Sequence, residues 1–529
     1  MSNKFNKKTG VGIAVFLILC AVILFFANTF VKMKLESTIK TLPESVRLNY
    51  SALDVNVFDG GLSVENPELN IIEGAKGRVE LNVKLQDIKL KNVGYWDYIV
   101  NNTIHLDTIL VKGAEISFVR GLGKASDSTQ QKDNKPKNEN KDAKPKKEFN
   151  KIVKIDNFDL NRATLTIFET TKDSIFLKSE NINITFDSIY FDANTAKQSI
   201  PFEYSDYHVL TDSLKFNAGQ YETINLHALE LSKKRWVFRQ FKLKTKYSKH
   251  ELSKIIDKER DHFDVSVDSI TIEAPEFGSV NKRFYFKSNK VLFQKPFLEV
   301  YRDKLVADDN TIKPLYSEML RNLKFDLTLP SVILKDGQIV YEEKSKPHVN
   351  AGTISFHEFN ADIKNVSNTY ASPVKTELDI NTLFMNSAPL HANWTFDVND
   401  EHDTFLFKTQ IGKLPVKRLN AFTENNVGIK LEGQFDKIYA RIDGNVQRSS
   451  IDFDVKYENV KVQILNKKHH KNKFLSTVAN IFIRKDSDKA DDGFIVKRGH
   501  VTRDKTKSVF NFLWLNFKEG LKLVFVGKI

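Results

Sequence analysis

The stretch "IHLDTILVKGAEISFV", which runs from Ile104 to Val119, alternates apolar and polar residues on both sides of a turn-like Lys-Gly-Ala. Successive apolar members of this pattern are three, two, five and two residues apart: Leu106, Ile109, Val111, Ile116 and Phe118. Alternation with a period of two places side chains on one face of a β-strand. The pattern therefore predicts strand, tight turn and strand, which together form a hairpin with one apolar face.

The same spacing recurs along the chain, with Asn-Arg-Ala or Asp-Gly-Gln in the longest gap of the two full copies. These full copies are Ile155, Phe158, Leu160, Leu165 and Ile167, then Leu329, Val332, Leu334, Ile339 and Tyr341. Shorter copies are Leu85, Ile88, Leu90 and Tyr95, then Val267, Ile270, Ile272 and Phe277. Recurrence at this scale predicts a chain assembled from similar β-units.

Local signals place further turns and a few helices. The segment "VRLNYSALDVNVFDGGLSVENPELNI" has a hairpin signal at Asp59–Gly61 and a turn signal at Asn66–Pro67. Short helices are predicted at Pro314–Leu323, Pro415–Asn425 and Lys473–Arg484. Residues 507–526 form a stronger, amphipathic helix pattern. Its predicted apolar stripe is Phe510, Leu513, Trp514, Phe517, Leu521, Val524 and Phe525. This helix either caps the apolar end of the sheet or lies on a membrane surface.

An uncharged segment from Gly10 to Val31 is long enough, as a helix, to cross a bilayer core about 30 Å thick. It exceeds the usual apolar length of a cleaved signal peptide, so it predicts an uncleaved transmembrane anchor. Lysines flank it on both sides, and those preceding it favour a cytoplasmic N-terminus with the bulk of the chain exported.

Composition limits the other classes of function. The net charge is +13, but the lysines are spread along the chain and no basic recognition helix stands out, so no nucleic-acid partner is expected. The single cysteine, Cys20, lies in the apolar segment and permits no disulfide framework. Residues 121–150 are rich in Lys, Asn, Asp and Pro and predict a disordered insertion between adjacent strands. No nucleotide, metal or nucleophile motif stands out, so neither an enzyme nor a cofactor is expected.

A sheet with one apolar face must hide that face from water. The predicted helices are too few and too short to cover several hundred residues of strand. The sheet can close on itself as a sandwich or barrel core. Alternatively, it curls into a trough whose apolar floor is covered by acyl chains, since bare apolar surface costs about 25 cal/mol per Å². The sequence leaves both solutions open.

The chain resembles the AsmA-like family of inner-membrane-anchored proteins of the Gram-negative envelope. The resemblance rests on the anchor, the "VRLNYSALDVNVFDGGLSVENPELNI" opening, repeats such as "LPSVILKDGQIVYEE", and "GQFDKIYARIDGNVQRSSIDFDVKYENVKVQIL" before a terminal apolar helix. It implies bridge-like lipid transfer along a repeating β-groove, periplasmic exposure and movement of phospholipid towards the outer membrane. The chain is short for a bridge that spans the periplasm alone.

These arguments predict a mostly β fold. An N-terminal transmembrane helix precedes an elongated, curled antiparallel sheet, shaped as a groove, with a few short helices and a C-terminal amphipathic helix. The expected organisation is a cytoplasmic N-terminus (1–9), the anchor (10–31), an N-terminal β-region (32–120), the insertion (121–150), the groove body (151–465) and a C-terminal region (466–529).

The expected partners are phospholipid and the inner membrane, with envelope proteins as further candidates. The alternative is an anchored periplasmic scaffold, or a modulator of outer-membrane protein assembly, that carries no lipid. The candidate groove residues are Leu106, Ile109, Val111, Ile116, Phe118, Ile155, Phe158, Leu160, Leu165, Ile167, Val267, Ile270, Ile272, Leu329, Val332 and Leu334.

Overall fold

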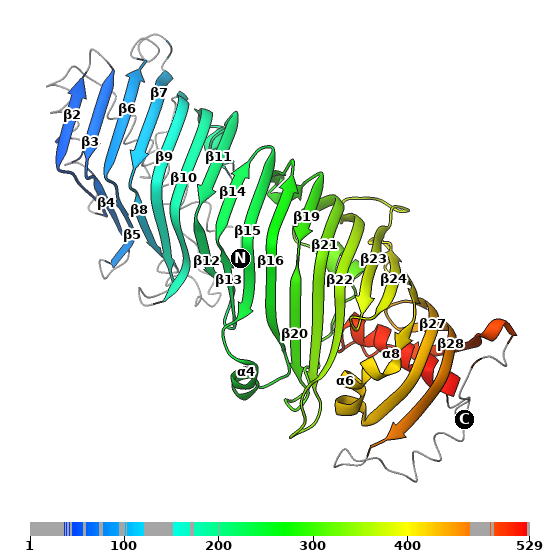
Figure 1. Cartoon of the computed structure of the whole chain (residues 1–529). Helices are drawn as coiled ribbons and strands as arrows, with labels where there is room; N and C mark the ends of the chain where they lie inside the picture. The colour runs from blue at the N-terminus through cyan, green and yellow to red at the C-terminus, as the bar shows by residue number, and fades with distance from the viewer. Residues whose placement is uncertain are drawn as a thin grey trace, which may run out of the picture. The chain divides into compact units, whose positions relative to one another are not determined.

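The computed structural model describes residues 36–37, 39, 42, 45–56, 60–73, 78–94, 101, 103–120, 152–169, 174–198, 200–465, 487 and 491–525. These residues are mostly β-strand, as predicted (Figure 1). The predicted anchor (10–31), the insertion (121–150) and the helix at Lys473–Arg484 lie outside the described residues. Among the helices that are described, none has both the length and the apolar character needed to cross a membrane.

Contacts divide the chain into two compact units. The first holds the described residues up to Asn217 together with Asn225–Trp236, and the second holds Ala218–Ile224 and the residues from Val237 onward.

The described part of the first unit consists almost entirely of β-strands. They are β1 (Val46–Asn49), β2 (Ala52–Asn56), β3 (Gly61–Glu65), β4 (Glu68–Glu73), β5 (Arg78–Lys84), β6 (Asp87–Val93), β7 (Thr103–Lys112), β8 (Glu115–Val119), β9 (Ile152–Phe168), β10 (Ile175–Phe191), β11 (Asp206–Thr211), β12 (Ser213–Asn217) and β14 (Ala228–Ser232). The short helix η1 (Thr195–Lys197) follows β10, while β13 (Glu222–Leu226) and β15 (Arg235–Thr245) have residues in both units.

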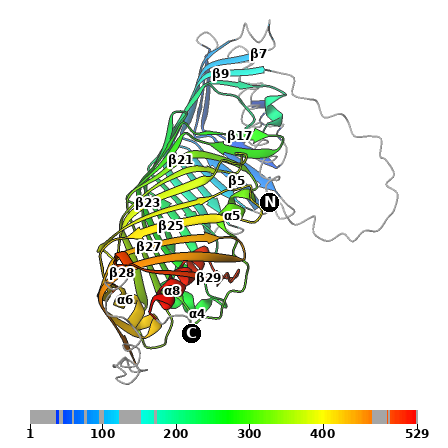
Figure 2. The ribbon, with the colours of Figure 1, turned by 90° about the vertical axis from the view of Figure 1, so that its right-hand side faces the viewer.

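The second unit adds longer strands and most of the helices (Figure 2). Its strands are β16 (Asp261–Glu273), β17 (Glu276–Val280), β18 (Arg283–Lys287), β19 (Lys290–Gln294), β20 (Phe297–Asp303), β21 (Asp326–Lys344), β22 (Gly352–Ser367), β23 (Thr376–Phe384), β24 (Ala388–Phe396), β25 (Phe405–Ile411), β26 (Leu414–Pro415), β27 (Ile429–Gly444), β28 (Arg448–Ile464) and β29 (Ile495–Thr502). Its helices are α4 (Lys249–Ile255), α5 (Tyr316–Arg321), η2 (Val416–Leu419), α6 (Asn420–Phe422), η3 (Thr423–Val427), η4 (Asp491–Gly493) and α8 (Val509–Phe525).

The stretch Ile104–Val119 does not form a hairpin. Strands β7 and β8 both pair in parallel with β9, and the register is unbroken between them, since Lys112 faces Asn161 and Glu115 faces Thr164. Gly113 between them has φ +59°, a left-handed conformation that a residue without Cβ adopts at no steric cost. The hairpin prediction is therefore wrong here, because the two segments are one strand with a bend.

The longest gap of the other two full copies also marks a bend. Ile155–Ile167 lies wholly within β9, and Leu329–Tyr341 lies wholly within β21. Arg162 (φ +58°) and Asp336 (φ +54°) are left-handed, and the pairing register shifts beside them. A β-bulge bends its strand and increases the local twist. The repeated turn chemistry is thus that of bulges, which curve a sheet without reversing the chain.

Chain reversals occur elsewhere. Strands β2 and β3 pair antiparallel on either side of the Asp59–Gly61 signal, which confirms that hairpin. At Asn66–Pro67 the prediction of a turn is wrong, because the pairing of β2 with β3 continues as the pairing of β1 with β4 past this point. A tight hairpin missed by the sequence analysis joins β17 to β18 through Asn281 (φ +51°) and Lys282 (φ +65°).

The pairing is antiparallel for most strands but not for all, so the prediction of an antiparallel sheet is confirmed only in part. Strands β7 and β8 run parallel to β9, and β18, β19 and β20 run parallel to β21. Parallel neighbours need a crossover connection. The chain between β20 and β21 contains α5, and the chain between β8 and β9 contains the predicted insertion, which therefore joins adjacent strands as expected.

The C-terminal end of the second unit holds a closed core. Helix α8 packs on β28 and β29, with Phe512 (1% exposed) against Phe405 and Gly520 against the ring of Phe453 (Figure 2). A Cβ at Gly520 would lie 2.6 Å from Cγ of Phe453, so glycine permits this close approach. This packing confirms the prediction that the terminal helix caps the apolar end of the sheet.

The buried face of α8 differs from the predicted stripe. It is formed by Val509, Phe512, Leu513, Asn516, Gly520 and Leu523. Phe510 is 61% exposed and Trp514 is 36% exposed, so these two members of the predicted stripe are wrong. The polar Asn516 is fully buried because it accepts a hydrogen bond from Ser449 Oγ (2.9 Å) and donates one to the carbonyl of Phe512 (2.9 Å).

Candidate functional site: an apolar sheet face

Cross-strand partners on neighbouring strands lie on the same face of a sheet. In the second unit they define one row, hereafter the apolar row, that crosses from β16 to β28. Its members are Ile272, Val291, Val332, Ile363, Leu378, Trp394, Phe407, Ile442 and Ile451. A second row beside it is also almost wholly apolar: Ile270, Phe293, Leu334, Ala361, Ile380, Ala392, Thr409, Ala440 and Phe453.

The residues between these two rows point to the opposite face and are mostly polar. They are Thr271, Leu292, Ile333, Asp362, Asp379, Asn393, Lys408, Arg441, Asp452 and Arg498. The sheet of this unit is therefore amphipathic from β22 to β28, with an apolar and a polar face, whereas Leu292 and Ile333 make the opposite face apolar at β19 and β21.

The apolar row is covered at one end and partly exposed at the other. Ile442 and Ile451 are fully buried in the C-terminal core beneath α8, and Trp394 is 4% exposed. Towards β16 the core stops. Val291 and Val332 are buried but belong to neither hydrophobic cluster of the described residues. The partly exposed apolar side chains of the two rows in this part are Ile270, Ile272, Phe293, Leu334, Ile363 and Ile380.

The structure separates the predicted groove residues into different environments. In the first unit Leu106, Ile109, Val111 and Ile155 are buried at 0–3% exposure in one hydrophobic cluster. Partly exposed members in that unit are Ile116, Phe118, Phe158, Leu160, Leu165 and Ile167, of which Phe158 and Leu160 pack against the cluster. Past the bend, Ile116 pairs with Leu165, and Phe118 pairs with Ile167.

In the second unit the predicted residues fall on or near the two rows. Ile272 and Val332 belong to the apolar row, and Ile270 and Leu334 belong to the row beside it. Leu329 is partly exposed and pairs with Val366, while Val267 is 4% exposed.

Other residues of the two rows were not predicted from the sequence: Phe293, Ile363, Leu378, Ile380 and Trp394. Alternation in "TELDINTLF" and "HANWTF" gives the spacing of Leu378, Ile380 and Trp394, but only strand pairing shows that they continue the same face.

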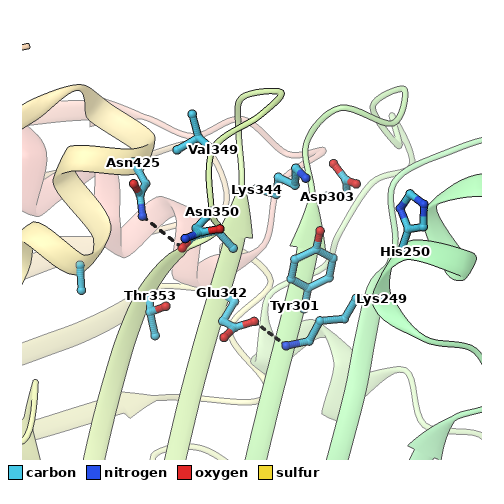
Figure 3. Close-up of a pocket in the computed structure, with 12 residues that line it drawn as sticks. Lys249, His250, Tyr301, Asp303, Glu342, Lys344, Val349, Asn350, Thr353 and Asn425 are labelled. Atoms are coloured by element: carbon cyan, nitrogen blue, oxygen red, sulfur yellow. Dashed lines mark hydrogen bonds and ion pairs between the residues drawn. The ribbon is translucent and has the colours of Figure 1, made fainter. Parts of the chain in front are cut away.

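A separate cavity of about 630 Å³ lies between α4 and η3 (Figure 3). Its lining includes Tyr301, Glu342 and Thr353, which are cross-strand partners. Their neighbours Tyr341 and Ile354 point to the other face, where Ile354 packs against the C-terminal core. The cavity therefore opens on the polar face of the sheet.

Lys249 of α4 lines this cavity and pairs with two carboxylates. Its ammonium contacts Glu299 (2.8 Å) and Glu342 (2.5 Å) and lies 5.3 Å from the ring centre of Tyr301 (Figure 3). Burial lowers the pKa of Lys249, but the two carboxylates outweigh it, so the pKa lies above its ordinary value. Lys249 thus stays protonated at neutral pH and is no base or amine nucleophile there. Its role in this arrangement is to hold α4 on the sheet.

Two further observations concern this site. Within the described residues, no group of His, Cys, Asp and Glu side chains is placed to hold a metal ion. Neither a comparison with protein-family models nor a comparison with curated proteins finds a match to this chain.

Proposed function

We propose that this protein is a membrane-anchored envelope protein that binds phospholipid along the apolar face of its sheet and conducts it for outer-membrane homeostasis. One observation carries the proposal: an apolar face that is closed by α5 and α8 at its C-terminal end continues over β16 to β22, where no hydrophobic cluster of the described residues covers the two rows. An acyl chain laid on this face gains about 0.8 kcal/mol for each methylene that it buries.

The bends support the same proposal. Left-handed residues inside long strands, such as Arg162, Asp336 and Asn459, curve the sheet locally, and a curved sheet encloses a lipid better than a flat one. The anchor predicted from the sequence at Gly10–Val31 and the resemblance to AsmA-like proteins support an inner-membrane location with the body in the periplasm.

The test measures phospholipid that co-purifies with the full-length protein, by extraction and mass spectrometry. Leu334→Asp places a charge on the apolar face, where desolvation of a carboxylate by an acyl chain is costly. We expect this variant to lose most of its bound phospholipid. Ile333→Asp is the matched control, since the adjacent residue faces the opposite side of the sheet and is also partly exposed. Circular dichroism of both variants checks that the sheet is retained.

A scaffold without lipid cargo is the second candidate. The burial of Leu106, Ile109 and Ile155 in the first unit favours it, because these predicted floor residues form a closed core. Purified wild-type protein without phospholipid would support the scaffold and refute lipid conduction. Equal phospholipid in the Leu334→Asp and Ile333→Asp variants would show that lipid binds somewhere other than the apolar rows.

A further inference from the structure

The apolar row contains one polar atom without a partner. Nε1 of Trp394 is buried and makes no hydrogen bond to the part of the chain that the structure describes, and the residue is 4% exposed. A buried N–H group without an acceptor costs about 1–3 kcal/mol, and native proteins leave few such groups. Phenylalanine at this position would supply the aromatic packing without that cost. The indole N–H therefore calls for an acceptor that the described residues do not provide.

The neighbours of Trp394 are aromatic rings. Tyr316 lies 5.4 Å away between ring centres, with Phe407 at 5.9 Å, Phe405 at 6.1 Å and Phe396 at 6.3 Å. Tyr316 is the ring that α5 places over the row, and it is partly exposed. Its hydroxyl makes no hydrogen bond to the described residues, and burial raises its pKa, so it keeps its proton. Two hydrogen-bond donors thus occur together in otherwise apolar surroundings.

Trp394 also lies close to the edge of the closed core. On one side along the row, Ile442 belongs to this core, and on the other side Leu378 still packs against it, whereas Ile363 is partly exposed and lies outside it. From β24 to β16 the row crosses β23, β22, β21 and β19, which at about 4.8 Å per strand interval gives roughly 24 Å of apolar floor. A long acyl chain laid along this floor would end beside Trp394.

We propose that Trp394 and Tyr316 form a polar subsite at the closed end of the groove, which binds an acyl oxygen of a bound amphiphile. The indole N–H and the phenol O–H donate to this oxygen, which is the carbonyl of an acyl ester or the carboxyl group of a free fatty acid. The subsite rests on the proposed lipid binding and assigns it an orientation, with the acyl oxygen at β24 and the chain running towards β16.

The test compares binding of three radiolabelled probes to the full-length protein in detergent: a phosphatidylglycerol, palmitic acid and hexadecane, which has no acceptor. We expect Trp394→Phe to lower the affinity for one oxygen-bearing probe by about tenfold, which corresponds to the loss of one hydrogen bond. The affinity for hexadecane should stay unchanged. Whether phosphatidylglycerol or palmitic acid is affected identifies the ester or the free acid as the ligand. Trp514→Phe, which makes the same chemical change on α8, is the control and should alter nothing.

A second measurement uses the unmutated protein. The chain has 4 tryptophans, so ¹⁵N-indole NMR gives few signals, and Trp394→Phe identifies the relevant one. A downfield shift of that N–H on adding the preferred probe supports the subsite. The subsite is overturned, with lipid binding left intact, if the signal does not move on adding the probe. The same holds if Trp394→Phe binds every probe with the affinity of the wild type. Failure of the wild type to bind any probe overturns the subsite and the proposed function together.

Discussion

The packing of α8 leads to a prediction that separates two phenylalanines on one helix. Phe512 is 1% exposed and packs edge-on against Phe405, with ring centres 6.1 Å apart, whereas Phe510 is 61% exposed. Replacing a buried phenylalanine by alanine costs about 3–5 kcal/mol, which combines lost transfer free energy with a residual cavity. The better helix propensity of alanine returns about 0.5 kcal/mol. We therefore expect Phe512→Ala to lower the free energy of unfolding by about 3–4 kcal/mol.

The assay is urea unfolding of the full-length protein followed by circular dichroism, with hydrogen exchange measured across α8 and β28. Phe510→Ala is the matched control and should change the stability by no more than about 0.5 kcal/mol. Exchange should rise in α8 and in the strands beneath it for Phe512→Ala alone. A loss of stability in Phe510→Ala as large as that in Phe512→Ala would refute the observed orientation of α8 and restore the stripe expected from the sequence.

Two further predictions concern the backbone and the acid stability. At Gly433 φ is +100°, and a Cβ would lie 2.3 Å from the carbonyl oxygen of Asn459. Gly433→Ala should therefore destabilise the second unit by about 3 kcal/mol or more in the same urea assay. An unchanged urea midpoint would contradict the bulge at this position. Burial raises the pKa of Glu259, but the ammonium groups of Lys304 (2.7 Å) and Lys507 (3.0 Å) outweigh it, and the pKa lies below its ordinary value. The stabilisation is therefore present above the unfolded pKa, about 4.3, and is lost as the pH falls through the folded pKa. Glu259→Gln should lower the urea midpoint at pH 6 and reduce its fall between pH 5 and pH 3; an equally steep fall would assign acid sensitivity to other groups.

The sequence by itself determined that the chain is mostly β and that its strands are amphipathic, because alternation and helical spacing are local properties of the chain. It also located α5 and α8. It missed α4, although Ser248 and Glu251 form a capping box, with Ser248 Oγ accepting from the Glu251 N–H at 3.3 Å and Glu251 accepting from the Ser248 N–H at 2.9 Å.

Only the tertiary structure decided whether a left-handed residue reverses a strand or bends it. Gly113 and Asp336 have the same local conformation as residues of a hairpin turn, so the residue types cannot separate the two outcomes. The distinction lies in which strand pairs with which. Likewise, Phe510 and Phe512 are equally apolar, and Phe512 is buried because β25 places Phe405 opposite it. The apolar row exists only through strand pairing, since each of its members comes from a different strand.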